Sequence, residues 1–119
     1  MSKVIVLGAS SNPSRTSYLA VQKLKDAGHE VFPIGVNKGQ IHGIEIINEQ
    51  PLLEQIDTVT LYLNPERQAA YYDYLLSLKP KRIIFNPGTE NPILVQLAQQ
   101  NGIQVEVACT LVLLATHSY

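Results

Sequence analysis

A chain of 119 residues is long enough to bury one hydrophobic core but too short for a nucleotide-binding domain plus a separate catalytic domain. We therefore expect a single domain over residues 1–119. The 9 basic and 10 acidic residues leave a net charge of −1, which disfavours nucleic acid and anionic membranes as partners. No apolar run reaches the ~20 residues of a membrane span, so a cytoplasmic location is expected. The single cysteine, Cys109, excludes an internal disulfide and a cysteine-rich metal site.

Short apolar runs alternate with helical patterns along the chain. In chain order, the patterns predict a strand at Val4–Leu7, a helix at Ser17–Ala27, strands at Glu30–Ile34 and Thr58–Leu63, a helix at Pro65–Leu78, a strand at Arg82–Phe85, a helix at Pro92–Gln100 and a strand at Gln104–Val107. Continuous β-branched runs separated by helices are typical of a parallel sheet covered on both faces. The predicted fold is a small Rossmann-like, three-layer α/β/α domain with a mostly parallel sheet of five strands or slightly more.

The punctuation of the chain agrees with this pattern. Gly28 and Gly102 follow helical patterns, where a left-handed residue is expected, and Asn91-Pro92 predicts an N-cap followed by a proline at the first helical position. The weaker pattern of residues 35–57 predicts a loop with room for a short strand, and then a one- or two-turn helix at Pro51–Gln55. The tail at Thr110–Tyr119 is expected to add a last helical turn against the sheet.

The segment from Gly8 to Tyr18 joins the first predicted strand to the first predicted helix. Such a loop directs backbone N–H groups and the positive end of a helix at a ligand above it. Ser10 and Ser17 add hydroxyl donors, and the guanidinium of Arg15 suits phosphate oxygens, although Arg15 also fits a solvated loop. The segment therefore predicts an anion-binding site, with a phosphate as its occupant.

This loop lacks the dinucleotide fingerprint of three glycines. Only Gly8 is present, because Ser10 and Pro13 stand where the second and third glycines belong. The one nearby acid, Glu30, begins the second strand instead of ending it, and no G-K-[ST] triplet follows the loop. An NAD(P)-binding redox or nucleotide-sensing protein is thus an alternative interpretation without its usual motif.

The chain resembles the small CoA-binding proteins related to the N-terminal nucleotide-binding domain of the succinyl-CoA synthetase alpha subunit. The matching residues run in order through Gly8-Ala9-Ser10, Pro13, Arg15, Ser17-Tyr18, Gly28–Pro33, Gly43, Asn64-Pro65, Asn86-Pro87-Gly88 and Cys109, almost the whole chain. The resemblance implies CoA or an acyl-CoA across the C-terminal strand ends, with its phosphates over residues 8–17. The predicted binding residues are Gly8, Ala9, Ser10, Arg15, Ser17, Asn37, Lys38, Asn64, Pro65, Asn86 and Gly88.

Two segments depart from the family pattern. Relatives often have Val-Asn-Pro after the second strand, where this chain has Ile34-Gly35-Val36. Asn37 and Lys38 follow, either to meet a ribose or adenine edge and a phosphate, or as an exposed loop. At Phe85–Glu90 the chain keeps the family's glycine and an amide in place of glutamine. Asn86 is expected to bond the ligand or the adjacent loop, and Gly88 to contact the ligand or supply a turn.

The resemblance implies binding without catalysis. The succinyl-CoA synthetase alpha subunit uses a phosphorylated histidine from a second domain that this sequence does not contain. His29, His42 and His117 are scattered and show neither metal-ligand nor nucleophile–base spacing, so no metal is expected. Cys109 is either a small buried hydrophobe or a thiol beside the pantetheine arm.

One predicted helix is rich in tyrosine. Tyr71, Tyr72 and Tyr74 are expected to serve the core in part and a homo-oligomer contact in part, because interfaces are enriched in aromatic residues. A third interpretation of the chain follows, an interaction domain with a vestigial nucleotide pocket. It predicts a stable complex and no response to nucleotides.

Overall fold

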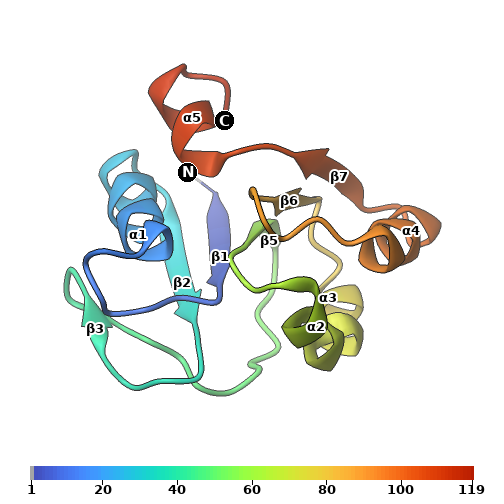
Figure 1. Cartoon of the computed structure of the whole chain (residues 1–119), viewed down its shortest axis with the longest axis horizontal. Coiled ribbons are helices and arrows are strands. Elements are labelled where there is room, and N and C mark those ends of the chain that lie inside the picture. Colours follow the sequence, from blue (N-terminus) through green and yellow to red (C-terminus); the bar gives the residue numbers. More distant parts are fainter. Residues whose placement is uncertain (1) are drawn as a thin grey trace.

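The computed structural model describes residues 2–119 and has a parallel five-stranded sheet at its centre (Figure 1). The strand order is β2-β1-β5-β6-β7, and every neighbouring pair runs parallel. The bounds are Lys3–Leu7 for β1, Glu30–Ile34 for β2, Ile56–Leu61 for β5, Arg82–Phe85 for β6 and Gln104–Val107 for β7. The predicted fold class and the predicted number of strands are both confirmed.

Helices cover both faces of this sheet (Figure 1). The helices α1 (Thr16–Asp26) and α5 (Thr110–Ala115) lie on one face, and α3 (Tyr72–Leu78) and α4 (Pro92–Gln100) lie on the other. Strand β1 alternates between the two cores, with Val4 and Val6 under α1 and Ile5 and Leu7 under α3 and α4. Because both faces of β1 are buried by helices, its side chains are apolar at successive positions.

The C-terminal ends of the parallel strands meet at one edge of the sheet. The register aligns Leu7 with Ile34 of β2 and with Leu61 of β5, and Leu61 with Phe85 of β6. The segments that follow these four residues are therefore neighbours in space although they are far apart in the sequence. Open α/β sheets bind their ligands at this edge.

The predicted ends of the helices are confirmed. The Asn91 side chain accepts hydrogen bonds from the backbone N–H groups of Ile93 (3.1 Å) and Leu94 (3.4 Å), so Asn91 caps α4. Gly28 and Gly102 follow α1 and α4 with φ of +93° and +74°. The tail forms α5, but its helix ends at Ala115 and does not reach Tyr119.

In the middle of the chain, one predicted helix is wrong and a second has the predicted first and last residues but is interrupted. The segment Pro51–Gln55 forms no helix, because Gln55 takes a left-handed φ of +59° and the Tyr74 hydroxyl bonds the Pro51 carbonyl oxygen (2.7 Å). The predicted helix Pro65–Leu78 is divided into α2 (Pro65–Gln68), a 3₁₀ turn η1 (Ala69–Tyr71) and α3. Both alanines of η1 are exposed, so neither holds that turn against the sheet.

The expected loop after β2 contains a small hairpin in place of a single short strand. Strand β3 (Gln40–Ile41) pairs antiparallel with β4 (Ile44–Glu45). His42 and Gly43 turn the chain between them, with φ of +49° and +81°. The hairpin buries Ile41 and Ile46 against the core beside α1.

The tyrosines of the α3 region have different surroundings. Tyr74 is buried, the Tyr72 hydroxyl accepts a hydrogen bond from the Asn91 side chain (2.8 Å), and Tyr71 faces a cleft described below. The homo-oligomer contact stays a prediction.

The stability of the fold is expected to decrease in alkaline solution. Burial raises the pKa of Tyr74 from 10.0 to about 12, so the folded protein keeps this proton to a higher pH than the unfolded chain. The contribution of the protonated Tyr74 hydroxyl to the free energy of unfolding is complete below pH 10, and it is lost as the pH rises toward 12. Urea unfolding at a series of pH values should show a shallower loss for Tyr74→Phe than for the wild type. Equal losses in the two proteins would contradict this assignment.

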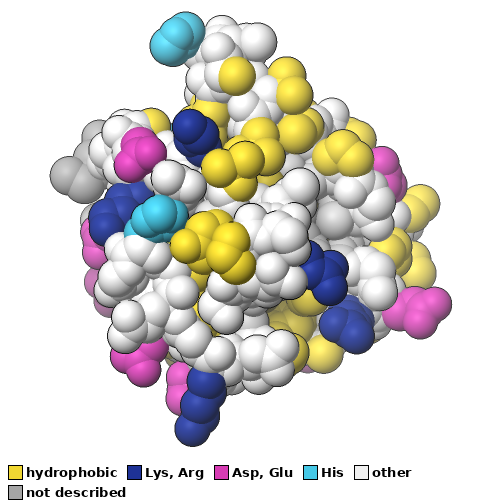
Figure 2. Space-filling model, turned by 60° about the vertical axis from the view of Figure 1, so that its left-hand side comes forward, with side chains coloured by type: hydrophobic (Ala, Val, Ile, Leu, Met, Phe, Trp, Pro, Cys, Tyr) yellow, Lys and Arg dark blue, Asp and Glu magenta, His cyan; other side chains and the backbone are white. Residues whose placement is uncertain are grey.

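The surface agrees with the balanced composition. On the face shown in Figure 2, basic and acidic side chains are interspersed and form no continuous area of one sign. Within residues 2–119, no helix has both the length and the apolar character needed to cross a bilayer. The same residues contain no group of three His, Cys, Asp or Glu side chains arranged to hold a metal ion.

Candidate functional site

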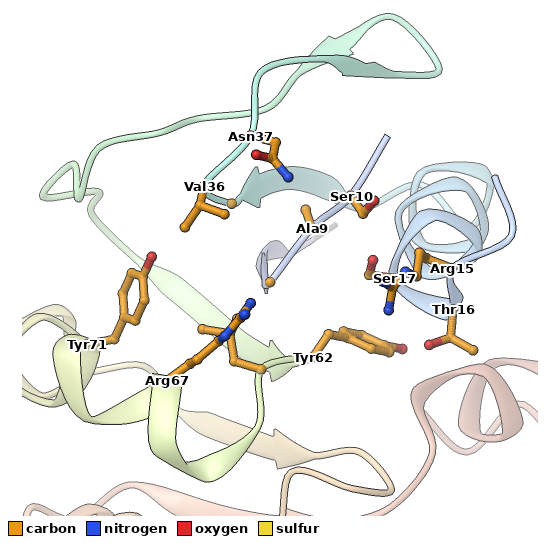
Figure 3. Close-up of a pocket in the computed structure, with 13 residues that line it drawn as sticks. Ala9, Ser10, Arg15, Thr16, Ser17, Val36, Asn37, Tyr62, Arg67 and Tyr71 are labelled. Carbon is orange, nitrogen blue, oxygen red and sulfur yellow. The ribbon is translucent and has the colours of Figure 1, made fainter. Parts of the chain in front are cut away.

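A cleft opens at the C-terminal ends of β1, β2 and β5 (Figure 3). We call it the main cleft. Four segments form its walls: the β1–α1 loop with the start of α1, the segment after β2, the end of β5, and α2 with η1. The lining residues are Gly8, Ala9, Ser10, Arg15, Thr16, Ser17, Gly35, Val36, Asn37, Tyr62, Leu63, Arg67 and Tyr71.

The β1–α1 loop is held by hydrogen bonds within the protein. The backbone N–H groups of Gly8 and Ala9 both donate to the Ile34 carbonyl oxygen, at 2.8 and 2.9 Å. Farther along, the Asn12 side chain accepts from the backbone N–H of Ser14 (3.0 Å) and from its hydroxyl (2.8 Å). The amides of Gly8 and Ala9 are thus already used, and they shape the cleft instead of donating into it.

Two glycines let the backbone segments around the cleft approach one another. Gly8 has a φ of +96°, and a Cβ atom there would lie 2.8 Å from the Tyr62 carbonyl carbon. A Cβ atom at Gly35 would overlap the carbonyl oxygen of Ala9. Gly35, which departs from the family pattern in sequence, is therefore required where the segment after β2 meets the β1–α1 loop.

The N-terminus of α1 faces the main cleft without compensation from the protein. Arg15 occupies the N-cap position, no side chain caps the helix, and the first turn carries no acidic residue. Within residues 2–119, the backbone N–H groups of Thr16 and Ser17 have no hydrogen-bond acceptor. Free N–H groups and the positive end of the helix dipole together favour an anion at this position.

Two arginines point into the main cleft from opposite walls (Figure 3). Arg15 extends from the start of α1 beside Ser17, and Arg67 rises from α2 toward the ends of the central strands. Both residues are exposed, and neither guanidinium has a hydrogen bond or an ion pair within the described residues. The sequence reasoning selected Arg15 and missed Arg67.

A second hollow continues from the main cleft over the ends of β5 and β6. We call it the side cleft. It shares Arg15, Thr16, Tyr62, Leu63 and Arg67 with the main cleft, and adds Asn64, Pro87, Gly88 and Thr89. Gly88 has a φ of +91° with open space around a Cβ atom, so the turn alone accounts for this glycine.

The lining of the two clefts is suited to binding anions. Among the described lining residues, none is Asp, Glu, His, Lys or Cys. Burial raises the pKa of Tyr62 to about 12, so its phenol is neutral at physiological pH. The clefts therefore offer two arginine side chains, hydroxyl groups and free N–H groups, which are the donors that an anion requires.

The structure brings together most of the residues selected from the sequence. Gly8, Ala9, Ser10, Arg15, Ser17 and Asn37 line the main cleft, and Asn64 and Gly88 line the side cleft. Whether they contact a ligand stays a prediction. Three selected residues line neither cleft, namely Lys38, Pro65 and Asn86.

The structure places these three residues outside the two clefts. Lys38 lies beside Glu45 and Glu49 in a separate hollow, and Pro65 begins α2. Asn86 is 2 % exposed and bonds the Thr60 hydroxyl (2.6 Å), the Leu61 carbonyl oxygen (2.8 Å) and the Thr110 N–H (2.8 Å). The Asn86 side chain thus bonds β5 and the first residue of α5, whereas the sequence predicted a bond to the ligand or to the adjacent loop. Cys109 is half-buried and also lines neither cleft.

Most of the lining residues that the sequence reasoning missed lie just after a strand or in the first turn of a helix, at the C-terminal edge of the sheet. Examples are Val36 after β2, Tyr62 and Leu63 after β5, and Arg67 in the first turn of α2. The predicted strand Thr58–Leu63 included Tyr62 and Leu63, whereas β5 ends at Leu61, so this error in the bounds of the strand hid both residues.

Solved structures and curated proteins include relatives of this chain. A crystal structure of an uncharacterized protein is 50% identical, covers 100% of this chain and 98% of its own, and has a TM-score of 0.98. The uncharacterized protein YneT of Bacillus subtilis (strain 168) is 22% identical over 84% of this chain and 75% of its own length.

A larger enzyme shares the fold. The dinucleotide-forming acetyl-coenzyme A synthetase 1 of Ca. Korarchaeum cryptofilum is 19% identical over 87% of this chain, with a TM-score of 0.73, and this chain covers 25% of it. The model of the family described as "CoA binding domain" matches residues 2–115. The match spans nearly all of the 119 residues, and the chain therefore belongs to the CoA binding domain family.

Proposed function

We propose that this chain binds CoA or an acyl-CoA in the main cleft, with the phosphates at the N-terminus of α1, and that it catalyses no reaction of its own. The observation that carries the proposal is the uncompensated start of α1. Free N–H groups of Thr16 and Ser17 and the unpaired guanidinium of Arg15 converge there. The family assignment supports the same ligand class.

The chemistry of CoA fits this edge of the sheet. CoA carries an ADP moiety with an additional phosphate, so its phosphates supply the anion that the free start of α1 favours. The neutral lining of the clefts, apart from the two arginines, supports binding without proton transfer.

The structure favours CoA over NAD. An NAD site uses a carboxylate at the C-terminal end of the second strand to hold the ribose hydroxyls. Here Glu30 is the first residue of β2 and lies opposite Lys3 in the register of β1 and β2, at the other end of the sheet. Strand β2 ends at Ile34, and Gly35 follows it. The carboxylate is thus missing from the lining where NAD would need it.

Removing the charge of Arg15 should weaken binding of CoA. Isothermal titration calorimetry of the full chain is expected to show CoA binding, and Arg15→Gln should lower the affinity by about tenfold or more, because a charged hydrogen bond is lost. Lys23→Gln is a matched control that removes one exposed positive charge from α1 away from both clefts. It should leave the affinity unchanged.

Other outcomes of the titration separate the alternatives. Binding of NAD(P) without binding of CoA would favour a redox or nucleotide-sensing protein. Absence of binding by CoA, acetyl-CoA and NAD(P), together with a stable oligomer or partner complex, would favour an interaction domain with a vestigial pocket. Equal CoA affinities for the wild type and Arg15→Gln would show that the phosphates lie elsewhere.

A further inference from the structure

The main cleft and the side cleft share a stretch of lining that carries both unpaired arginines, and we call this stretch the junction. Arg15 and Arg67 line both clefts, together with Tyr62 at the end of β5. A ligand that occupies both clefts therefore lies against the stretch of lining that supplies the two guanidinium groups. They come from opposite walls, Arg15 from the start of α1 and Arg67 from α2 (Figure 3).

The backbone under Arg67 is fixed although its side chain is exposed. The Asn64 side chain accepts a hydrogen bond from the Arg67 N–H (2.9 Å). The next residue, Gln68, is fully buried, and its amide donates to the carbonyl oxygens of Leu63 (2.9 Å) and Thr89 (2.8 Å). The backbone from which the Arg67 side chain extends is thus fixed beside the junction, so a ligand has to order only the side chain itself.

The charge at the junction is unbalanced. The two guanidinium groups are the only charged side chains among the described residues that line either cleft. The chain as a whole has a net charge of −1, so this local positive charge is not a general property of the surface. An anionic group placed between the arginines would relieve their repulsion and accept charge-assisted hydrogen bonds from both.

We propose that Arg67 is a second phosphate-binding residue. Together with Arg15 it binds the diphosphate that links the two halves of the ligand. This inference rests on the proposed CoA binding. In CoA the diphosphate lies between the adenosine and the pantetheine arm, as the junction lies between the two clefts. The 3′-phosphate is a terminal substituent and does not need to occupy a junction. The adenosine then occupies the main cleft, and the neutral arm passes through the side cleft.

The experiment compares two ligands that share the diphosphate. Titration calorimetry with CoA and with 3′-dephospho-CoA is carried out on the wild type, Arg67→Gln, Arg67→Lys and the control Lys23→Gln. Arg67→Gln should weaken both ligands by the same factor, about tenfold. Arg67→Lys should retain part of the affinity, since it keeps the charge and loses the planar fork. Thermal unfolding without ligand should be unchanged in Arg67→Gln, because the side chain has no partner within the described residues.

Each remaining outcome contradicts a defined part of the account. Weaker binding of CoA alone, with 3′-dephospho-CoA unaffected, would assign Arg67 to the 3′-phosphate and overturn the inference. Unchanged affinity for both ligands in Arg67→Gln would remove Arg67 from the site and leave the proposed function intact. A wild type that binds neither ligand would overturn the proposed function, and the role of Arg67 with it.

Discussion

Replacing Asn86 with alanine is expected to lower the free energy of unfolding by about 3 kcal/mol, because it leaves buried polar groups without partners. The Asn86 side chain joins the end of β6 to the Leu61 carbonyl oxygen of β5 and to the Thr110 N–H at the start of α5. Leu61 and Thr110 are both fully buried, so water cannot replace these bonds. Urea unfolding followed by circular dichroism measures the change.

Asn101→Ala is the matched control for this substitution. Asn101 is exposed, and its side chain donates to the Leu97 carbonyl oxygen (2.8 Å). Its removal should cost less than about 1 kcal/mol, as is usual for an exposed hydrogen bond. Folded Asn86→Ala protein should keep the CoA affinity of the wild type, since Asn86 lines neither cleft. Loss of affinity without loss of stability would instead make Asn86 a ligand contact.

Replacing Gly8 with alanine is also expected to cost about 3 kcal/mol, for two separate reasons. A side chain at a φ of +96° is strained by about 1 kcal/mol or more. In addition, the new Cβ atom would lie 2.8 Å from the Tyr62 carbonyl carbon, and forcing this contact apart adds about 1–3 kcal/mol. The shift would move the β1–α1 loop away from β5, so the affinity for CoA should fall as well.

Gly28 separates these two contributions. It has a similar φ of +93°, but nothing lies within 4 Å of a Cβ atom there. Gly28→Ala should therefore cost only the backbone strain, about 1–2 kcal/mol, and leave CoA binding unchanged. If Gly8→Ala and Gly28→Ala destabilise the protein equally, the close approach of β1 and β5 at Gly8 does not contribute as described.

The architecture could be predicted from the sequence because both faces of the sheet are buried. Continuous apolar runs such as Val4–Leu7 arise only where helices cover the strand on each side, and the alternation with helical patterns then defines a parallel sheet. The cap at Asn91 was predictable for a similar reason, because its cause lies within the next three residues.

The errors fall where contacts distant in the sequence decide the local structure. The segment Pro51–Gln55 has an acceptable helical composition, but its conformation is set by the hydroxyl of Tyr74 and by the left-handed Gln55. The break at Ala69–Tyr71 likewise follows from which neighbouring side chains reach the core. Neither influence is visible in a window of the sequence.

In the candidate site too, the residues of one continuous segment were predictable, and those brought in by distant segments were not. Residues on the β1–α1 loop were found because one continuous segment supplies them. Arg67, Tyr62 and Gly35 come from other strand ends and join the site only through the order of the strands in the sheet. Asn86 shows the converse, since a polar residue after a strand reads as a ligand contact until the structure shows its three internal partners.

A crystal structure of the full chain with CoA tests the central claim most directly. The account predicts density for the diphosphate between Arg15 and Arg67, within hydrogen-bonding distance of the backbone N–H groups of Thr16 and Ser17. Adenosine should lie in the main cleft and the pantetheine arm in the side cleft. CoA bound outside both clefts, or with its phosphates away from the start of α1, would contradict it.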